Sequence, residues 1–122
     1  EQQKKTHELV NSLINKYGKR NIILLSPIKK STGSKLSRMY SKIYCKYGEN
    51  VDSSRVTYET IHSFKGLEKD IVILNDFSQI NDNYMTLLYV GLTRARYEAY
   101  LFCKSEAKAI ISKKIISYYN NM

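Results

Sequence analysis

Short, solidly apolar segments alternate along this chain with amphipathic ones. NIILLSP (21–27) and DIVILNDF (70–77) are apolar almost throughout, as expected of strands that are buried on both faces. RVTYET (55–60) and EAYLFC (98–103) are rich in β-branched and aromatic residues and are further strand candidates. Helix-like segments separate these runs. The alternation predicts an α/β fold, with a parallel sheet flanked by helices on both faces in a single compact domain.

The segments between the strands carry apolar residues at spacings of three and four. This spacing predicts helices over 6–17, 34–47 and 83–96. A glycine follows each of the first two, as is typical of helix ends. Ser105 can cap a last helix, which would follow the final strand. In parallel sheets of this kind, ligands bind beyond the carboxyl ends of the strands, where residues 60–68 are expected to lie.

Composition limits the possible functions. The chain has 122 residues, 43% hydrophobic and 25% charged, which suits one folded domain and excludes a disordered chain. No apolar run is long enough to cross a bilayer. Cys45 and Cys103 form no CxxC pair and lack metal-ligand spacing, so we expect no metal site and buried thiols in a reducing, cytoplasmic setting.

The positive charge is concentrated in the first part of the chain. The net charge is +9, and residues 1–48 hold 11 Lys or Arg against two acidic residues, whereas the remainder holds nine of each. Basic surfaces attract polyanions, and nucleic acid is the usual one. A solvated, lysine-rich face is the alternative interpretation.

The segment STGSK (31–35) is similar to the end of a phosphate-binding Walker A loop but does not complete it. That loop needs a glycine five residues before Gly33, where Ile28 stands, and Ser or Thr after Lys35, where Leu36 stands. No apolar strand ends in paired acids that could hold magnesium. A complete NTPase would therefore lack two essential parts in this chain.

Two other segments resemble helicase motifs. TIHSFKGLE (60–68) resembles motif V of the superfamily 1 helicases of the UvrD/Rep type, T-x-H-x-x-K-G-L-E, with matches at Thr60, His62, Lys65, Gly66, Leu67 and Glu68. LLYVGLTRAR (87–96) resembles motif VI, L-x-Y-V-x-x-T-R-A, with matches at Leu87, Tyr89, Val90, Thr93, Arg94 and Ala95. The two occur in the family's order, and the resemblance covers residues 56–103.

The resemblance implies a particular domain of a larger protein. In that family, two RecA-like domains close on ATP, with single-stranded DNA lying across both. Residues 1–122 are similar to the C-terminal RecA-like domain alone, and only 28 residues separate Pro27 from Val56, too few for the accessory domain of some relatives. ATP and Mg²⁺ would be held mainly by the N-terminal RecA-like domain. The implied partners are that domain and single-stranded DNA, and the implied activity is ATP-dependent DNA unwinding or translocation, for example in DNA repair.

The nucleotide roles of motif residues carry over one position at a time. Arg94, near the end of the predicted helix, would be the catalytic arginine finger, and a surface ion pair is the alternative. Arg96 would face elsewhere, toward solvent or acidic neighbours. Glu68 would accept a hydrogen bond from the ATP ribose, and Gly66 would allow close approach or a positive φ. Lys65 would bind a phosphate or brace the loop.

The DNA roles fall to the start of the first motif. Thr60 would contact a phosphate, and His62 would contact the DNA backbone or a base, with an internal hydrogen bond as its alternative. Tyr89 is expected to be core packing rather than a stacking platform. Lys69 stands where an aromatic or apolar residue commonly follows the glutamate, which would loosen the packing or add a positive charge near DNA.

Two other functions compete with a motor. One is a non-catalytic nucleic-acid-binding module with relic helicase motifs, which would use the basic first 48 residues. The other is the helicase part of a nuclease-helicase. A GxxxxGK[ST] loop upstream in the parent protein would favour a motor, and its absence would favour the binding module.

Overall fold

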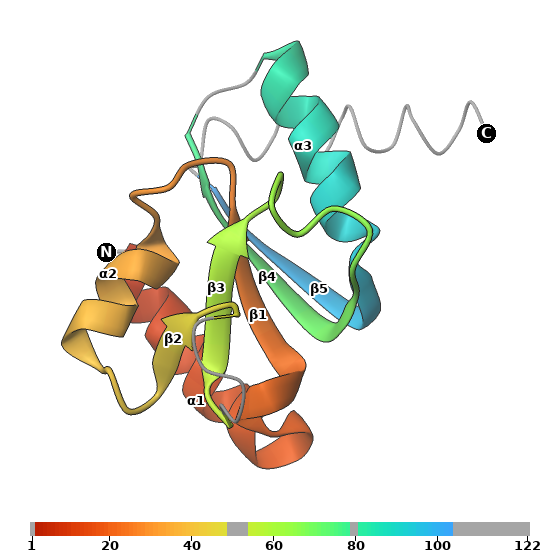
Figure 1. Ribbon diagram of the computed structural model, residues 1–122. Helices are drawn as coiled ribbons and strands as arrows, with labels where there is room; N and C mark the ends of the chain where they lie inside the picture. Colours follow the sequence, from red (N-terminus) through yellow and green to blue (C-terminus); the bar gives the residue numbers. More distant parts are fainter. Residues whose placement is uncertain (1, 49–53, 79–80, 104–122) are drawn as a thin grey trace.

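The structure, a computed structural model, describes residues 2–48, 54–78 and 81–103 and contains one parallel sheet. The helix predicted from Ser105 lies outside the described residues. The sheet has the strand order β2-β3-β1-β4-β5, and every pairing in it is parallel (Figure 1). Its strands are β1 Ile22–Ser26, β2 Tyr44–Lys46, β3 Val56–Thr60, β4 Lys69–Phe77 and β5 Ala95–Cys103. The predicted α/β fold with a RecA-like parallel sheet is confirmed.

Helices cover the sheet on both faces, as predicted. Helices α1 (Gln2–Tyr17) and α2 (Thr32–Met39) pack on one face, and α3 (Asp82–Leu92) packs on the other (Figure 1). A short 3₁₀ turn, η1 (Lys19–Asn21), leads from α1 into β1. None of the helices in the described ranges is long and apolar enough to span a membrane.

Two hydrophobic clusters explain why the central strands are apolar throughout. Along β1, Ile23 and Leu25 join the cluster under α3, whereas Ile22 and Leu24 join the cluster under α1 and α2. Strand β4 alternates in the same way, because successive side chains of a strand point to opposite faces. Both faces of these strands are therefore buried.

Two predicted helices are too long. The helix predicted over 34–47 ends at Met39, and Tyr44–Lys46 forms strand β2, which pairs with β3 at the edge of the sheet. The apolar residues after Met39 follow helical spacing, but Tyr44 and Cys45 are both buried in an extended chain. The burial gained at the sheet edge outweighs the local helical pattern.

The helix predicted over 83–96 ends at Leu92. The amide of Thr93 donates to the carbonyl of Tyr89, and the Thr93 hydroxyl donates to the carbonyl of Val90. The chain then enters β5 at Ala95, because the carbonyl of Arg94 accepts a hydrogen bond from the first residue of β4.

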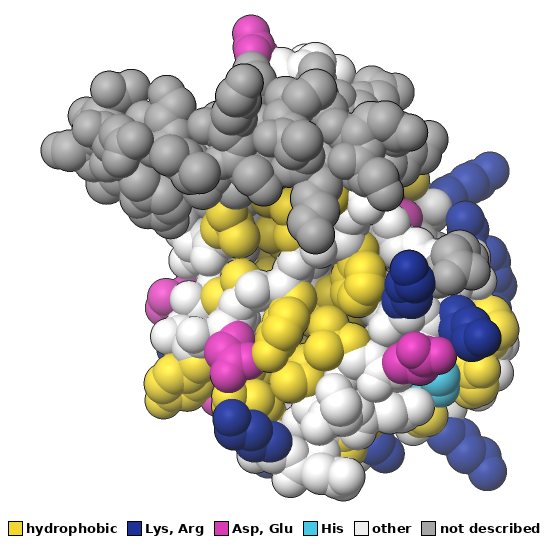
Figure 2. Space-filling model, turned by 180° about the vertical axis from the view of Figure 1, so that it is seen from behind, with side chains coloured by type: hydrophobic (Ala, Val, Ile, Leu, Met, Phe, Trp, Pro, Cys, Tyr) yellow, Lys and Arg dark blue, Asp and Glu magenta, His cyan; other side chains and the backbone are white. Residues whose placement is uncertain are grey.

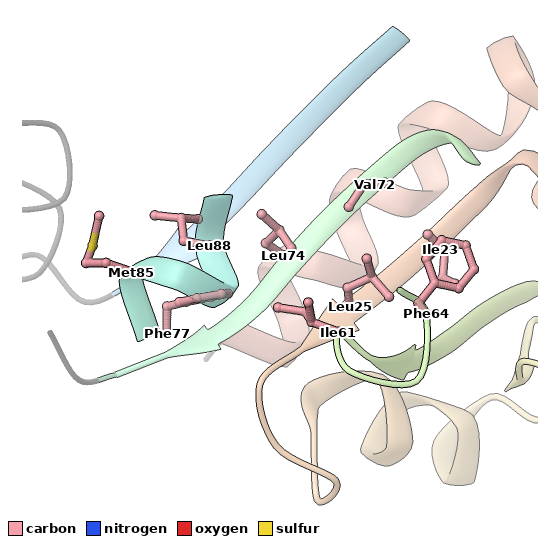
Figure 3. Close-up of a cluster of buried hydrophobic side chains, with 9 residues drawn as sticks. All are labelled: Ile23, Leu25, Ile61, Phe64, Val72, Leu74, Phe77, Met85 and Leu88. Atoms are coloured by element: carbon pink, nitrogen blue, oxygen red, sulfur yellow. The ribbon is translucent and has the colours of Figure 1, made fainter. Parts of the chain in front are cut away.

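The segment 61–68 crosses one face of the sheet. Strands β3 and β4 lie on opposite sides of β1 and run parallel, so the chain must return from the carboxyl end of β3 to the amino end of β4. Ile61 and Phe64 are fully buried and lie over Leu25 and Ile23 of β1 (Figure 3). This segment, called the crossing below, is therefore part of the hydrophobic core as well as the carrier of motif residues.

Candidate functional site

The crossing separates the predicted site residues into two groups. Thr60 pairs with Ser26 at the carboxyl end of the sheet. Glu68 directly precedes Lys69, whose amide donates to the carbonyl of Arg94 at the amino end. The two ends of β1 lie roughly 13 Å apart along the strand. The expectation that all of 60–68 lies beyond the carboxyl ends is wrong for the second half of the segment, because the parallel topology carries it back.

A polar cavity of about 290 Å³ opens at the carboxyl end, beside Thr60. The loop after β1, the end of β2, the end of β3 and the crossing all contribute to it. It carries two lysines, four hydroxyl groups and one carboxylate, and its lining residues are Ile28, Lys29, Ser31, Lys46, Tyr58, Glu59, Thr60 and Ser63. Lysines and hydroxyls can contact phosphate oxygens without reading base sequence. We call this hollow the lysine cavity.

Thr60 fixes the turn that starts the crossing. Its hydroxyl accepts a hydrogen bond from the Ser63 amide at 3.2 Å and donates to the Ser63 hydroxyl at 3.1 Å. Its carbonyl accepts from the amide of Phe64 at 3.2 Å. The Thr60 amide donates to the carboxylate of Glu59 at 2.8 Å. Thr60 therefore holds the wall of the lysine cavity in place, while His62, two residues on, is exposed.

Gly66 and Lys65 occupy an exposed turn of the crossing. Gly66 has a φ of 82°, a left-handed conformation that residues with a side chain adopt at a cost. Apart from Gly66 itself and its two chain neighbours, no described residue has an atom within 4 Å of the place where a Cβ would stand, so the space beside Gly66 is open. The amide of Lys65 donates to the carbonyl of His62 at 3.4 Å, and its side chain is exposed.

Arg94 joins the two motif segments at the amino end. The sequence predicts Arg94 near the end of a helix, but the residue lies in the turn between α3 and β5. Its guanidinium donates to the Leu67 carbonyl at 3.5 Å and to the Thr93 hydroxyl at 3.0 Å. The Arg94 Nε is buried and has no hydrogen-bond partner within the described residues. Buried donors without an acceptor are uncommon in folded proteins, so the Arg94 Nε–H group is an unusual feature of this turn. Glu68, close to Leu67 in sequence, is exposed.

Arg96 has a different environment from Arg94. Its Nε donates to the carboxylate of Asp70 at 2.8 Å, which confirms the expectation of an acidic neighbour. Arg96 lies on β5 rather than on a helix, and its side chain is 51% exposed. Exposed ion pairs contribute little to stability.

Lys69 lies at the amino end, opposite the lysine cavity. Its ammonium donates to the carbonyl of Arg20 at 2.6 Å and stands 5.9 Å from the centre of the Tyr47 ring. Burial, and then the positive charges of Arg20 and Arg96, lower the pKa of Lys69 below its usual value.

Of the residues that line the lysine cavity, sequence reasoning identified only Thr60; among those it missed are the polar residues Lys29, Ser31, Lys46 and Ser63. Lys29 and Ser31 follow the end of β1, so the rule that ligands bind at carboxyl strand ends could have identified them. Lys46 was hidden by the incorrect helix over 34–47. Figure 2 shows the molecule from behind. Most of the Lys and Arg side chains in this view lie on the side that carries α2 and the start of α1, in agreement with the basic first part of the chain.

The comparison with protein families matches part of the chain. Residues 56–102 match the family model of the UvrD-like helicase C-terminal domain. No curated protein matches the chain significantly. The matched range runs from the start of β3 almost to the end of β5, so it contains the crossing, α3 and the Arg94 turn. The resemblance found in segments 60–68 and 87–96 is thereby confirmed.

Proposed function

We propose that this UvrD-like helicase C-terminal domain is the second motor domain of an ATP-dependent superfamily 1 DNA helicase or translocase. It would supply an arginine finger and single-stranded DNA contacts to an N-terminal RecA-like domain of the same parent chain. One observation carries the proposal: the crossing connects a cavity with two lysines at one end of the sheet to Arg94 at the other. In a motor, such a connection would link the DNA contacts to the nucleotide contacts.

The amino end fits a nucleotide in two respects. The buried Arg94 Nε lacks a partner among the described residues, and the guanidinium's bond to the Leu67 carbonyl is long. An anionic ligand would therefore replace few existing hydrogen bonds of the guanidinium, although the buried Nε would become accessible only after the side chain reorients. The open space beside Gly66 would admit a ligand next to the backbone. Mg²⁺ is assigned to the partner domain on the resemblance to the helicase family alone.

Each residue at this end has a distinct task. ATP, when bound between the domains, supplies a γ-phosphoryl group for transfer to water. The planar guanidinium of Arg94 would exchange its weak bond to Leu67 for phosphoryl oxygens, where negative charge develops during transfer. Glu68 would accept a hydrogen bond from the ribose. Lys65 would bind a phosphate or brace the exposed turn.

The carboxyl end would hold single-stranded DNA by its backbone. Lys29 and Lys46 offer positive charge, and Ser31 and Ser63 offer hydroxyl groups around one cavity. Thr60 would contact a phosphate by exchanging the hydrogen bond that its hydroxyl donates to Ser63. His62 would add a contact from the exposed turn beside it. These groups suit phosphates rather than base edges, so binding would be independent of sequence and sensitive to salt. Closing on ATP would draw the crossing toward the partner domain, and opening would let the DNA contacts reset.

Hydrolysis of ATP by the longer parent protein, with and without single-stranded DNA, tests this proposal. The expected result is turnover that rises when single-stranded DNA is added. The 122-residue chain alone should show none, because it completes neither a Walker A loop nor a magnesium carboxylate pair. A parent that binds single-stranded DNA but hydrolyses no ATP would instead be the non-catalytic module with relic motifs.

A further inference from the structure

A carboxylate at the end of β4 holds the start of α2. The amide of Thr32, the first residue of α2, donates to Asp76 Oδ2 at 2.9 Å, and the Thr32 hydroxyl donates to Asp76 Oδ1 at 2.7 Å. Both carboxylate oxygens are thus engaged by one residue. Asp76 has a φ of 67° and is the only non-glycine residue with a positive φ in the described ranges. This conformation is costly unless the surroundings fix it.

A third element holds the Asp76 backbone in that conformation. The Asp76 amide donates to Gln2 Oε1, in the first turn of α1, at 2.8 Å. The neighbouring Asn75 is fully buried, and its side-chain amide donates to the Thr6 hydroxyl of α1 at 3.0 Å. Helix α1, the end of β4 and the start of α2 are therefore joined at Asp76.

This junction adjoins the lysine cavity. Thr32 directly follows Ser31, which lines the cavity and whose hydroxyl accepts from the Ser34 amide. The loop 27–31 also supplies Ile28 and Lys29 to the cavity. A second cavity, of about 260 Å³, is lined by Asp76, Thr32 and again Ile28, so Asp76 stands on the other side of the same loop.

We propose that Asp76 is a positioning residue for nucleic-acid binding: through Thr32 it fixes loop 27–31, so that Lys29 and Ser31 are preorganised for a phosphate of single-stranded DNA. The inference rests on the proposed function of the lysine cavity. Preorganisation raises affinity because less conformational entropy is lost on binding. Asp76 itself need not touch the ligand.

The sign of the charge makes this role testable. A carboxylate near a polyanion repels it, so removing Asp76 should strengthen DNA binding if the carboxylate acts through its charge alone. The positioning role predicts the opposite, because loop 27–31 loses its anchor. Weaker binding after the removal of a negative charge is therefore a signature that an electrostatic or passive role would not give.

Two variants of Asp76 separate the side chain from the backbone. Asp76→Gly removes the carboxylate and accepts the positive φ without strain, so the variant should fold. Asp76→Asn tolerates the same φ and keeps one acceptor oxygen, so it should show a smaller effect. Thr32→Val removes the hydroxyl donor from the other side. Glu8→Gln removes one negative charge from an exposed position on α1 and serves as the charge control.

Each protein is measured in two ways: by anisotropy titration with a fluorescent oligo-dT strand at fixed salt, and by amide hydrogen exchange. We expect Asp76→Gly to weaken binding roughly 2- to 10-fold, Asp76→Asn less, and Glu8→Gln to leave it equal or slightly tighter. Combined with Asp76→Gly, Thr32→Val should add little, because both act on one contact. Exchange of the amides over 28–35 should accelerate, while β1 and β3 stay protected.

The two readouts distinguish the possible failures. If Asp76→Gly binds as tightly as wild type, or more tightly, and exchange over 28–35 does not change, the positioning role is wrong. If the amides over 28–35 exchange faster in Asp76→Gly but its affinity for oligo-dT matches wild type, Asp76 anchors the loop without contributing to DNA binding. The inference is then also wrong. If wild type itself binds no oligo-dT at low salt, the proposed function of the cavity fails first.

Discussion

The amide of Lys69 donates a 2.9 Å hydrogen bond to the carbonyl of Arg94. This bond pairs the first residue of β4 with the residue before β5, so the end of the crossing and the Arg94 turn are directly joined. The Arg94 guanidinium reaches back to the Leu67 carbonyl from the same place. The two motif segments, 19 residues apart at their nearest ends in the sequence, thus meet at the amino end of the sheet.

Arg94→Ala in the parent protein should abolish most ATP turnover. The guanidinium is needed where charge builds up on the phosphoryl oxygens, and arginine fingers contribute on the order of 10³ to 10⁵ in rate. ATP affinity should fall less, because the partner domain is proposed to hold most of the phosphate. Single-turnover and steady-state hydrolysis, together with oligo-dT binding, would measure these effects.

Arg96→Ala is the matched control for that experiment. It removes an exposed ion pair with Asp70, which should cost at most about 1 kcal/mol of stability. Turnover should stay close to wild type. Equal losses in the two variants, or unfolding of the Arg94 variant, would make Arg94 a structural residue.

The sequence predicted the architecture well because the central strands bury both faces. Ile22 to Leu25 alternate between two cores, and only a sheet covered on both sides leaves no place for a polar residue in such a run. The motif segments were equally clear, since their spacing is fixed by the pattern that they match.

The sequence failed where tertiary contacts decide the local structure. Tyr44 was assigned to a helix because Tyr40, Ile43 and Tyr47 follow helical spacing, yet Tyr44 is buried in β2 and its hydroxyl bonds to His7 Nδ1 at 2.8 Å. The placement of Glu68 and Arg94 at the amino end also required the strand order, which periodicity does not contain. Residues of the lysine cavity come from three separate stretches of the chain, 28–31, 46 and 58–63, so no single motif could reveal them all.

Gly33→Ala should destabilise the fold. A Cβ at this position would stand 2.5 Å from the Cβ of Tyr58, where α2 lies close to β3. The backbone must shift to relieve that contact, at a cost of about 1–3 kcal/mol. Gly33, part of the incomplete Walker A pattern, therefore serves helix–strand packing. Urea unfolding would measure the loss, with the exposed Lys35→Ala two residues on as a control; an unchanged midpoint for Gly33→Ala would contradict the packing role.

The lowered pKa of Lys69 predicts a pH dependence of stability. In the interval below its usual value of 10.5, the unfolded chain binds more protons at this site than the folded one. The contribution of Lys69 to the free energy of unfolding therefore rises as pH increases toward 10.5. Urea unfolding of wild type and Lys69→Met at several pH values should measure this effect. As pH rises, the free energy of unfolding of wild type should increase relative to that of the variant. Lys65→Met removes an exposed charge and reports the effect of net charge alone. A difference that stays flat or falls as pH rises would contradict the desolvated environment of Lys69.

Lys29→Ala and Lys46→Ala should each lower the salt dependence of single-stranded DNA binding. A lysine that neutralises one phosphate contributes about 0.7 to the slope of log affinity against log salt on single strands. Both side chains line the same cavity, so each variant should lose roughly that amount, and the double variant about twice as much, with no change in sequence preference. Anisotropy titrations over a range of salt concentrations would give the slopes.

Lys16→Ala removes an exposed lysine on α1, whose ammonium lies near the Tyr17 ring away from the cavity, and should leave the slope unchanged. If all three variants lose the same slope, binding depends on net charge and not on the lysine cavity.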